Sequence, residues 1–377
     1  MRPVVKTALR RLWRDPTTLQ IGVHADRALV LSGVGGRAAE LVAALDGTRD
    51  HDDLRATARE LGLASGVADR LVDLLVEAAV VDDASTDPAV LATLSHVERD
   101  RLAPDLASIS LVSGRPDGGV SGLQRRREAL VRVVGGGRVG ATVASLLAAA
   151  GVGHVVVDDP EICRAHDCAP AGAAIGDTGA SRAGAAHAAM HRVSGSIRTG
   201  APDPGKRFDL VVLAPAGAWA PHAHDNLLRT GTPHLLATVR ETTGAVGPFV
   251  VPGVTACLRC LDLHRTDRDP AWPMIAAQLA TDPRRSTSAC DVTLATLVAS
   301  VAALQALAWL DDGGAARSPV ALPTHDGTLE ITLPDWRIRR RPWAKHPACG
   351  CHWPQSWADS GTGEGDNATG RRAYPAE

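Results

Sequence analysis

A glycine-rich loop between an apolar strand and an apolar helix constrains the fold of this chain more than any other feature. The short apolar run at 129–134 leads directly into the loop GGGRVG, and an Ala-rich helical pattern follows. Gly135, Gly137 and Gly140 form the pattern G-x-G-x-x-G. Its first glycine permits a tight turn, its second the approach of a phosphate, and its third close packing of helix against strand. In this strand–loop–helix order, the pattern predicts a Rossmann-like nucleotide-binding unit.

A second apolar strand, His154–Val157, ends at Asp158. An acid at this place binds ribose hydroxyls in Rossmann-like domains, and the helix after the loop offers free N–H groups to a phosphate. Two interpretations remain open. The loop binds a nucleotide, or the domain keeps its glycines for packing and binds nothing.

Alternating strand and helix patterns continue through residues 129–352 and predict an α/β domain with a mostly parallel sheet. The apolar segment Thr293–Leu310 is expected to be a buried core helix. Its flanks are aspartates rather than the basic residues that anchor a membrane span. Residues 353–377 are polar and Gly-rich, and we expect a disordered tail.

The N-terminal region, residues 1–85, predicts a small winged-helix-like α+β domain. Two short strands around a turn occupy 18–32, and a helix follows at Arg37–Leu45. Asp50 is placed to cap a second helix and Ser65 a third.

A connector at 86–128 separates the two predicted domains. Its sequence is rich in turn residues and charges. We expect one helix near 90–102 and one strand near 106–112.

The charge balance excludes a general attraction to nucleic acid, since the formal net charge is -2. The N-terminus lacks a long apolar run before any cleavage-like site, so no signal peptide is predicted. We therefore expect a cytoplasmic protein that binds neither nucleic acid nor a membrane.

Four of the seven cysteines fall into two tight pairs, Cys257 with Cys260 and Cys349 with Cys351. In a large cytosolic chain such spacing favours a metal over disulfides. Four thiolates close a tetrahedral zinc shell and leave no position for water, so the predicted role is structural. The alternatives are four reduced buried cysteines, or His346 or His352 in place of one ligand. The other cysteines, Cys163, Cys168 and Cys290, are expected to be small buried apolar residues or, alternatively, a reactive nucleophile.

The glycine loop, Asp158, CLRC, the long apolar helix and CGC follow one another in the order found in the ThiF/MoeB family, which this region resembles. The resemblance implies a Rossmann-like ThiF-type domain that uses ATP and Mg²⁺ to adenylate the C-terminus of a ubiquitin-like or sulfur-carrier protein. It also implies that Arg182 takes the place of the family's phosphate-binding lysine.

The sequence departs from this family at the residues that carry its chemistry. The family's Asn-Leu-x-Arg-Gln run corresponds to HDCAP, with Ala169 in place of the arginine. The strand at 208–213 runs into APAG, where the family has an acid that serves Mg²⁺. Adenylyl transfer depends on positioned cations and metal, so these losses argue against adenylation.

The N-terminal region resembles the PqqD-like peptide-recognition domains of ribosomal-peptide maturation systems. A PqqD-like domain before a degenerate ThiF-like domain resembles the leader-binding partner proteins of azole-forming cyclodehydratases, in which a separate YcaO enzyme consumes the ATP. This resemblance implies a non-catalytic protein that presents a leader peptide, or another small protein substrate, to a modifying enzyme. An active ATP-dependent adenylyltransferase is the alternative.

A peptide site in the N-terminal region is predicted from its small sheet. The edge of such a sheet has unpaired N–H and C=O groups, which an extended peptide can satisfy as an added strand. We expect this edge at the strand with Leu29 and Leu31, beside the helix with Leu71 and Leu75. A purely stabilising role, or a dimer interface, is the alternative, and the oligomeric state, homodimer included, is left open.

Overall fold

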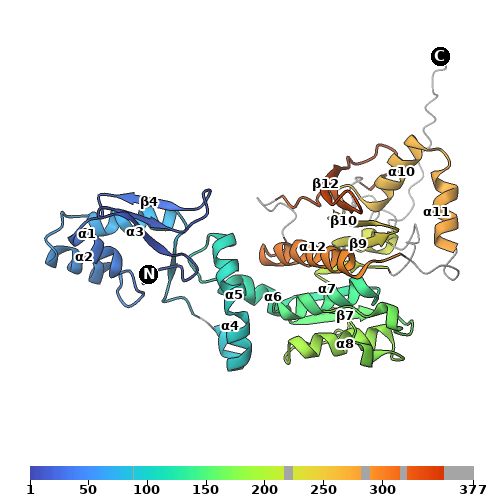
Figure 1. The fold of residues 1–377 in the computed structure, drawn as a ribbon, viewed down its shortest axis with the longest axis horizontal. Helices are drawn as coiled ribbons and strands as arrows, with labels where there is room; N and C mark the ends of the chain where they lie inside the picture. The colour runs from blue at the N-terminus through green and yellow to red at the C-terminus, as the bar shows by residue number, and fades with distance from the viewer. Residues whose placement is uncertain (88, 216–223, 282–288, 315–320, 352–377) are drawn as a thin grey trace, which may run out of the picture.

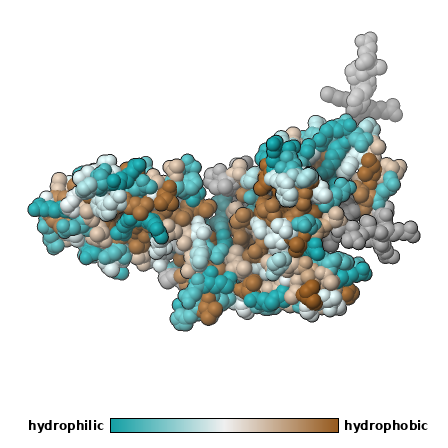
Figure 2. Space-filling model, viewed as in Figure 1, coloured by the Kyte–Doolittle hydropathy of each residue, from teal (hydrophilic) through white to brown (hydrophobic). Residues whose placement is uncertain are grey.

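The molecule is elongated, with a lobe at each end and helices between them (Figure 1). The computed structural model describes residues 1–87, 89–215, 224–281, 289–314 and 321–351. The predicted disordered tail at 353–377 and the alternative ligand His352 lie outside the described residues. The space-filling view shows the same two lobes, with hydrophilic and hydrophobic residues interspersed over the visible face (Figure 2).

The N-terminal lobe combines a three-stranded antiparallel sheet, a two-stranded sheet and three helices. The first sheet has the order β2-β3-β4, and in the second β1 pairs with β5. The elements are β1 Pro3–Val5, β2 Arg11–Asp15, β3 Thr18–Ile21, β4 Leu29–Ser32, α1 Arg37–Ala43, α2 His51–Glu60, α3 Val67–Glu77 and β5 Val81–Asp83. The strands predicted within 18–32 are therefore confirmed as β3 and β4, while β2 adds a strand that the sequence did not indicate.

This lobe has a hydrophobic core of its own. Leu19 and Ile21 of β3 and Leu75 of α3 are almost fully buried within it. The Asp50 carboxylate accepts the N–H groups of Asp52 and Asp53 and caps α2, as predicted. The predicted cap of α3 at Ser65 is wrong. The helix begins after Gly66, whose left-handed backbone (φ 76°) suits glycine.

The middle helices are α4 Ala89–Ala92, α5 His96–Ser113 and α6 Val120–Glu128. The strand predicted near 106–112 is wrong, because these residues form the last turns of the 18-residue helix α5. The Ser95 hydroxyl caps α5, and Leu102 and Ile109 are buried along its length, so tertiary packing continues the helix past Pro104.

Two buried ionic contacts join the parts. The Lys6 ammonium donates to the carbonyl and hydroxyl oxygens of Ser110, both at 2.7 Å, and lies 3.2 Å from Asp82. The Arg126 guanidinium binds Asp311 through two bonds of 2.6 and 2.7 Å. A buried charge that loses its partner is costly, so these pairs hold α5 to the N-terminal lobe and α6 to the α/β lobe.

A seven-stranded sheet forms the centre of the α/β lobe, in the order β12-β11-β10-β9-β8-β6-β7. The strands from β7 to β9 are parallel, and β10, β11 and β12 follow in antiparallel pairing. The strands are β6 Leu130–Val134, β7 His154–Asp158, β8 Leu210–Leu213, β9 His234–Arg240, β10 Thr243–Val250, β11 Gly327–Thr332 and β12 Arg337–Pro342. The predicted α/β class is confirmed.

Helices cover both faces of this sheet (Figure 1). They are α7 Arg138–Ala149, α8 Arg182–Val193, α9 Asp225–Arg229, α10 Leu258–Arg268, α11 Trp272–Thr281 and α12 Val292–Asp311. The main core lies on the face covered by α7, α8 and α12. By length and composition α12 alone among the described helices is able to cross a membrane, yet half of its apolar window is buried. It packs on β9 and β10 as the predicted core helix.

Candidate functional site

The glycine loop lies between β6 and α7 and is closely packed against its surroundings. A Cβ on Gly140 would lie 1.8 Å from the Gly135 carbonyl oxygen, and one on Gly135 would lie 2.1 Å from that of Ala214. Gly135 also has a φ of 103°, which side chains strongly disfavour. Close packing and backbone conformation are therefore sufficient to require glycine at these two positions, whether or not the loop binds a phosphate.

One backbone amide of the loop, that of Gly136, already has an anionic partner within the chain. The Gly136 N–H donates to Asp159 Oδ2 at 2.7 Å, and the other oxygen of this carboxylate accepts the Glu161 N–H at 3.0 Å. Asp159 is only 8% exposed. The predicted ribose ligand Asp158 is half exposed at the end of β7 and is paired with Arg132 of β6.

Arg182, the predicted phosphate-binding cation, begins α8 next to the loop. Its guanidinium binds both oxygens of the buried Asp167, at 3.0 and 2.9 Å, and lies 3.7 Å from Asp159. Burial opposes the charge of Arg182, but the bonds to Asp167 outweigh it and raise the pKa of the guanidinium. The charge of Arg182 is thus neutralised by two carboxylates of the chain itself.

The structure brings the four predicted zinc ligands together. The sulfurs of Cys257 and Cys260 are 3.8 Å apart, and Cys349 and Cys351 each have a sulfur 3.4 Å from one of these two. All four atoms lie within 4.8 Å of one another. Sulfurs on a tetrahedral zinc with bonds of about 2.3 Å would be separated by about 3.8 Å. The donor set and its spacing fit zinc.

Local structure positions these thiols. Cys257 occupies the N-cap position of α10, without a capping hydrogen bond from its side chain, and Cys260 lies in the first turn, where the helix N-terminus favours a thiolate. Hydrogen bonds, first of all with Cys257, lower the pKa of Cys260, whereas the bond with Cys260 raises the pKa of Cys257. Gly350, with φ 64°, allows the tight turn between Cys349 and Cys351.

His346 supports this turn and belongs to a separate cluster with His264 and Asp267. Its Nε2 lies 2.8 Å from the Asp267 carboxylate, and its Nδ1 accepts the Ala348 N–H at 3.1 Å. Both ring nitrogens are therefore used to hold the CGC turn to α10. His346 therefore holds the turn that carries Cys349 and Cys351, and does not replace one of the cysteines as a zinc ligand.

The four residues predicted to contact a peptide divide into two groups. Leu31 and Leu75 are core residues, at 7% and 0% exposure, so their side chains offer no surface to a ligand. Leu29 and Leu71 are half-buried. The exposed apolar side chains on the same two elements are Val30 of β4, at 41%, and Leu74 and Val76 of α3, at 43% and 37%.

Two of the remaining cysteines, Cys163 and Cys290, lie in surroundings that disfavour a reactive thiolate. Cys163 is buried, and burial raises the pKa of its thiol. Burial also raises the pKa of Cys290, which is partly exposed. A raised pKa disfavours the nucleophilic thiolate, which agrees with the expectation of apolar packing for these two.

Comparison with solved structures places this geometry among known folds. No protein-family model matches the sequence, and no curated protein sequence matches it. A crystal structure of E. coli MccB with ATP is similar at a TM-score of 0.66 and 12% identity, over 93% of this chain and 99% of that one. The chain shares the fold of MccB.

Another structure of MccB and one of PaaA are also similar to this chain. The microcin C7 biosynthetic enzyme MccB in complex with N-formylated MccA has a TM-score of 0.65 at 13% identity, with the same coverage. PaaA is similar at a TM-score of 0.64 and 16% identity, over 89% of this chain and 98% of that one. Since the match to MccB spans nearly the whole chain, it supports the predicted Rossmann-like ThiF-type fold and includes the N-terminal lobe.

Proposed function

We propose that this chain is a non-catalytic peptide-binding protein of a ribosomal-peptide maturation system. It binds a leader peptide or a small protein substrate and presents it to a separate modifying enzyme of the YcaO type. The fold shared with MccB, which has been crystallised with MccA, supports a peptide as the ligand.

The observation that carries this proposal is that carboxylates of the chain itself bind the Gly136 amide and the Arg182 guanidinium. A bound triphosphate needs free loop amides and unpaired cations. Here Asp159 takes the Gly136 amide, and Arg182 is committed to Asp167 and Asp159. An incoming phosphate would have to displace one carboxylate and approach another, which like-charge repulsion opposes. Binding of ATP and Mg²⁺ is therefore expected to be weak, and adenylation absent.

The peptide site belongs to the N-terminal lobe, as its PqqD-like pattern implies. Strand β4 is an edge of the three-stranded sheet, and an edge strand can pair with an added strand. Val30 on β4 and Leu74 on α3 offer exposed apolar contacts beside the core positions Leu31 and Leu75. Main-chain bonds to β4 would hold the peptide, and these side chains would select its apolar residues.

The test is hydrogen–deuterium exchange of the full chain with peptides encoded beside its gene. Strand addition should slow exchange in β4 and α3 and leave the opposite edge strand, β2, unchanged. If the exchange rates of β4 and α3 are the same with and without every such peptide, the proposed site is contradicted.

The alternative function is an ATP-dependent adenylyltransferase that acts on the C-terminus of a ubiquitin-like or sulfur-carrier protein. The shared fold with MccB in its ATP-bound crystal form favours it. Under this alternative, Gly135, Gly137, Gly140, Asp158 and Arg182 would hold the nucleotide after Asp167 releases Arg182. Peptide-dependent exchange of pyrophosphate into ATP would identify this activity.

Zinc, held by Cys257, Cys260, Cys349 and Cys351, has a structural role in this proposal. The pairs lie on α10 and on the segment after β12, so the metal would tie the end of the lobe to its middle. Binding at such a site contributes directly to folding free energy.

A further inference from the structure

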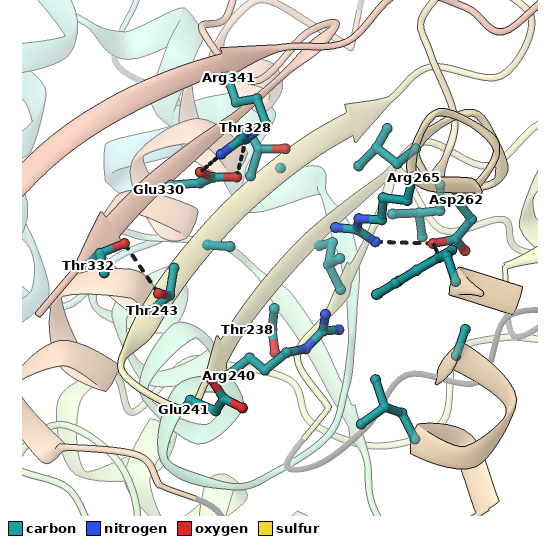
Figure 3. Close-up of a pocket in the computed structure, with 18 residues that line it drawn as sticks. Thr238, Arg240, Glu241, Thr243, Asp262, Arg265, Thr328, Glu330, Thr332 and Arg341 are labelled. Atoms are coloured by element: carbon teal, nitrogen blue, oxygen red, sulfur yellow. Dashed lines mark hydrogen bonds and ion pairs between the residues drawn. The ribbon is translucent and has the colours of Figure 1, made fainter. Parts of the chain in front are cut away.

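A pocket of about 380 Å³ lies on the face of the central sheet opposite α12, between the strands and the helices α10 and α11 (Figure 3). Its floor consists of small residues of neighbouring strands, Thr238 of β9 and Ala245 and Gly247 of β10. Leu279 of α11 forms part of an apolar wall. Pockets of this size accommodate side chains or small ligands, and neither the glycine loop nor the zinc cluster contributes to this one.

Two arginines point into this pocket from different elements, Arg240 from the end of β9 and Arg265 from α10 (Figure 3). Arg265 is fixed by its neighbours. It lies 3.1 Å from Asp262 and stacks 4.9 Å above the Trp272 ring, whose Nε1 also donates to Asp262 at 3.1 Å. Its guanidinium is held in place before any ligand arrives.

Arg240 differs from the other two arginines that line the pocket, Arg265 and Arg341. Arg265 is paired with Asp262 and Arg341 with Glu330. Within the part of the chain that the structure describes, no carboxylate lies at ion-pair distance from Arg240. Burial lowers the pKa of Arg265, Asp262 counters this, and the charge of Arg240 lowers the pKa further, so the two guanidinium groups repel each other. An anion between them would remove that repulsion.

We propose that Arg240 and Arg265 form a carboxylate subsite that receives an acidic side chain of the peptide substrate. Leu279 of α11, which lines the pocket, is 40% exposed, and Ile275 of the same helix is 39% exposed. Both would contact the neighbouring residues of the peptide. Planar guanidinium groups bind carboxylates through paired hydrogen bonds, which suits an Asp or Glu side chain over the small floor. This subsite rests on the proposed function in that its ligand is a peptide, but it lies in the α/β lobe, apart from β4.

The experiment selects displayed random heptapeptides on the full-length protein. Their C-termini are fused to the carrier, so only side chains supply carboxylates. The wild-type protein should enrich Asp or Glu at one fixed position. Arg240→Gln should lose this preference and bind the selected peptide about 10- to 100-fold more weakly, as expected for a lost charge-assisted contact.

Arg207→Gln is the matched control, because Arg207 is exposed, lies outside the pocket and undergoes the same change of charge. It should retain the acidic preference. No acidic preference in the wild type, or the same preference in Arg240→Gln, would overturn the subsite. If the subsite is overturned in this way but a peptide still protects β4 in hydrogen exchange, only the subsite has failed. If the acidic preference is found but β4 is never protected, the peptide site of the N-terminal lobe has failed instead.

Discussion

Replacing Asp159 by Asn tests whether the glycine loop is stabilised by the chain's own carboxylate. The side chain is buried, and its two oxygens accept the N–H groups of Gly136 and Glu161. Asn preserves the shape but removes the charge and turns one acceptor into an NH₂ donor that faces an N–H group. One charge-assisted hydrogen bond is lost, at a cost of about 1.5–3 kcal/mol in unfolding free energy.

For a lobe of roughly 200 residues, this loss lowers the unfolding temperature by about 3–12 °C. Differential scanning calorimetry measures it, with Asp203→Asn as a control on an exposed loop, where a change within about 0.5 kcal/mol is expected. The same variant should bind ATP and Mg²⁺ more tightly than the wild type does, since one repelling carboxylate is gone. The reasoning is refuted if Asp159→Asn unfolds like the wild type, or if the wild type binds ATP more tightly than the variant.

Three further predictions concern other parts of the molecule. Metal analysis should find roughly one zinc per chain in the wild type, and Cys257→Ser should lose this zinc and unfold at a lower temperature. Cys163→Ser should keep the metal, and a wild type without zinc would contradict the site. Leu74→Glu should weaken peptide binding about tenfold or more in fluorescence anisotropy and leave stability unchanged, because Leu74 is exposed; undiminished binding would exclude α3 from the peptide site. Burial lowers the pKa of His234 to about 4. As pH falls below about 6.5, this histidine therefore takes up a proton in the unfolded chain before it does so in the folded chain. Stability should then fall by about 3 kcal/mol between pH 6.5 and 4, and His234→Gln should flatten this slope in denaturant titrations; an unchanged slope would refute the assignment.

The sequence was most informative where local chemistry decides the structure. The glycine pattern after an apolar strand predicted β6, the loop and α7. Asp50, as a capping residue, predicted the start of α2. The cysteine spacing predicted a cluster that the structure confirms, although its halves are about ninety residues apart. In each case, few residue types satisfy the backbone or ligand geometry required.

Non-local interactions explain what the sequence did not reveal. The run LASISLV at 106–112 was expected to be a strand, but the packing of Leu102 and Ile109 makes it helical. The bonds of Asp159 to the loop and of Asp167 to Arg182 depend on how the chain folds back after β7, which no local pattern encodes. Likewise, Arg240 and Arg265 face one pocket only because α10 packs over the end of β9.

The most direct test of the central claim is ATP–pyrophosphate exchange by the full chain, measured with a peptide already shown by hydrogen exchange to protect β4. Binding is then established independently, so the assay reports on chemistry alone. A non-catalytic presenting protein should show exchange at background, with and without the peptide, and the peptide should be modified only when the separate enzyme is added. Peptide-dependent exchange by this chain alone would contradict the account and establish the adenylyltransferase.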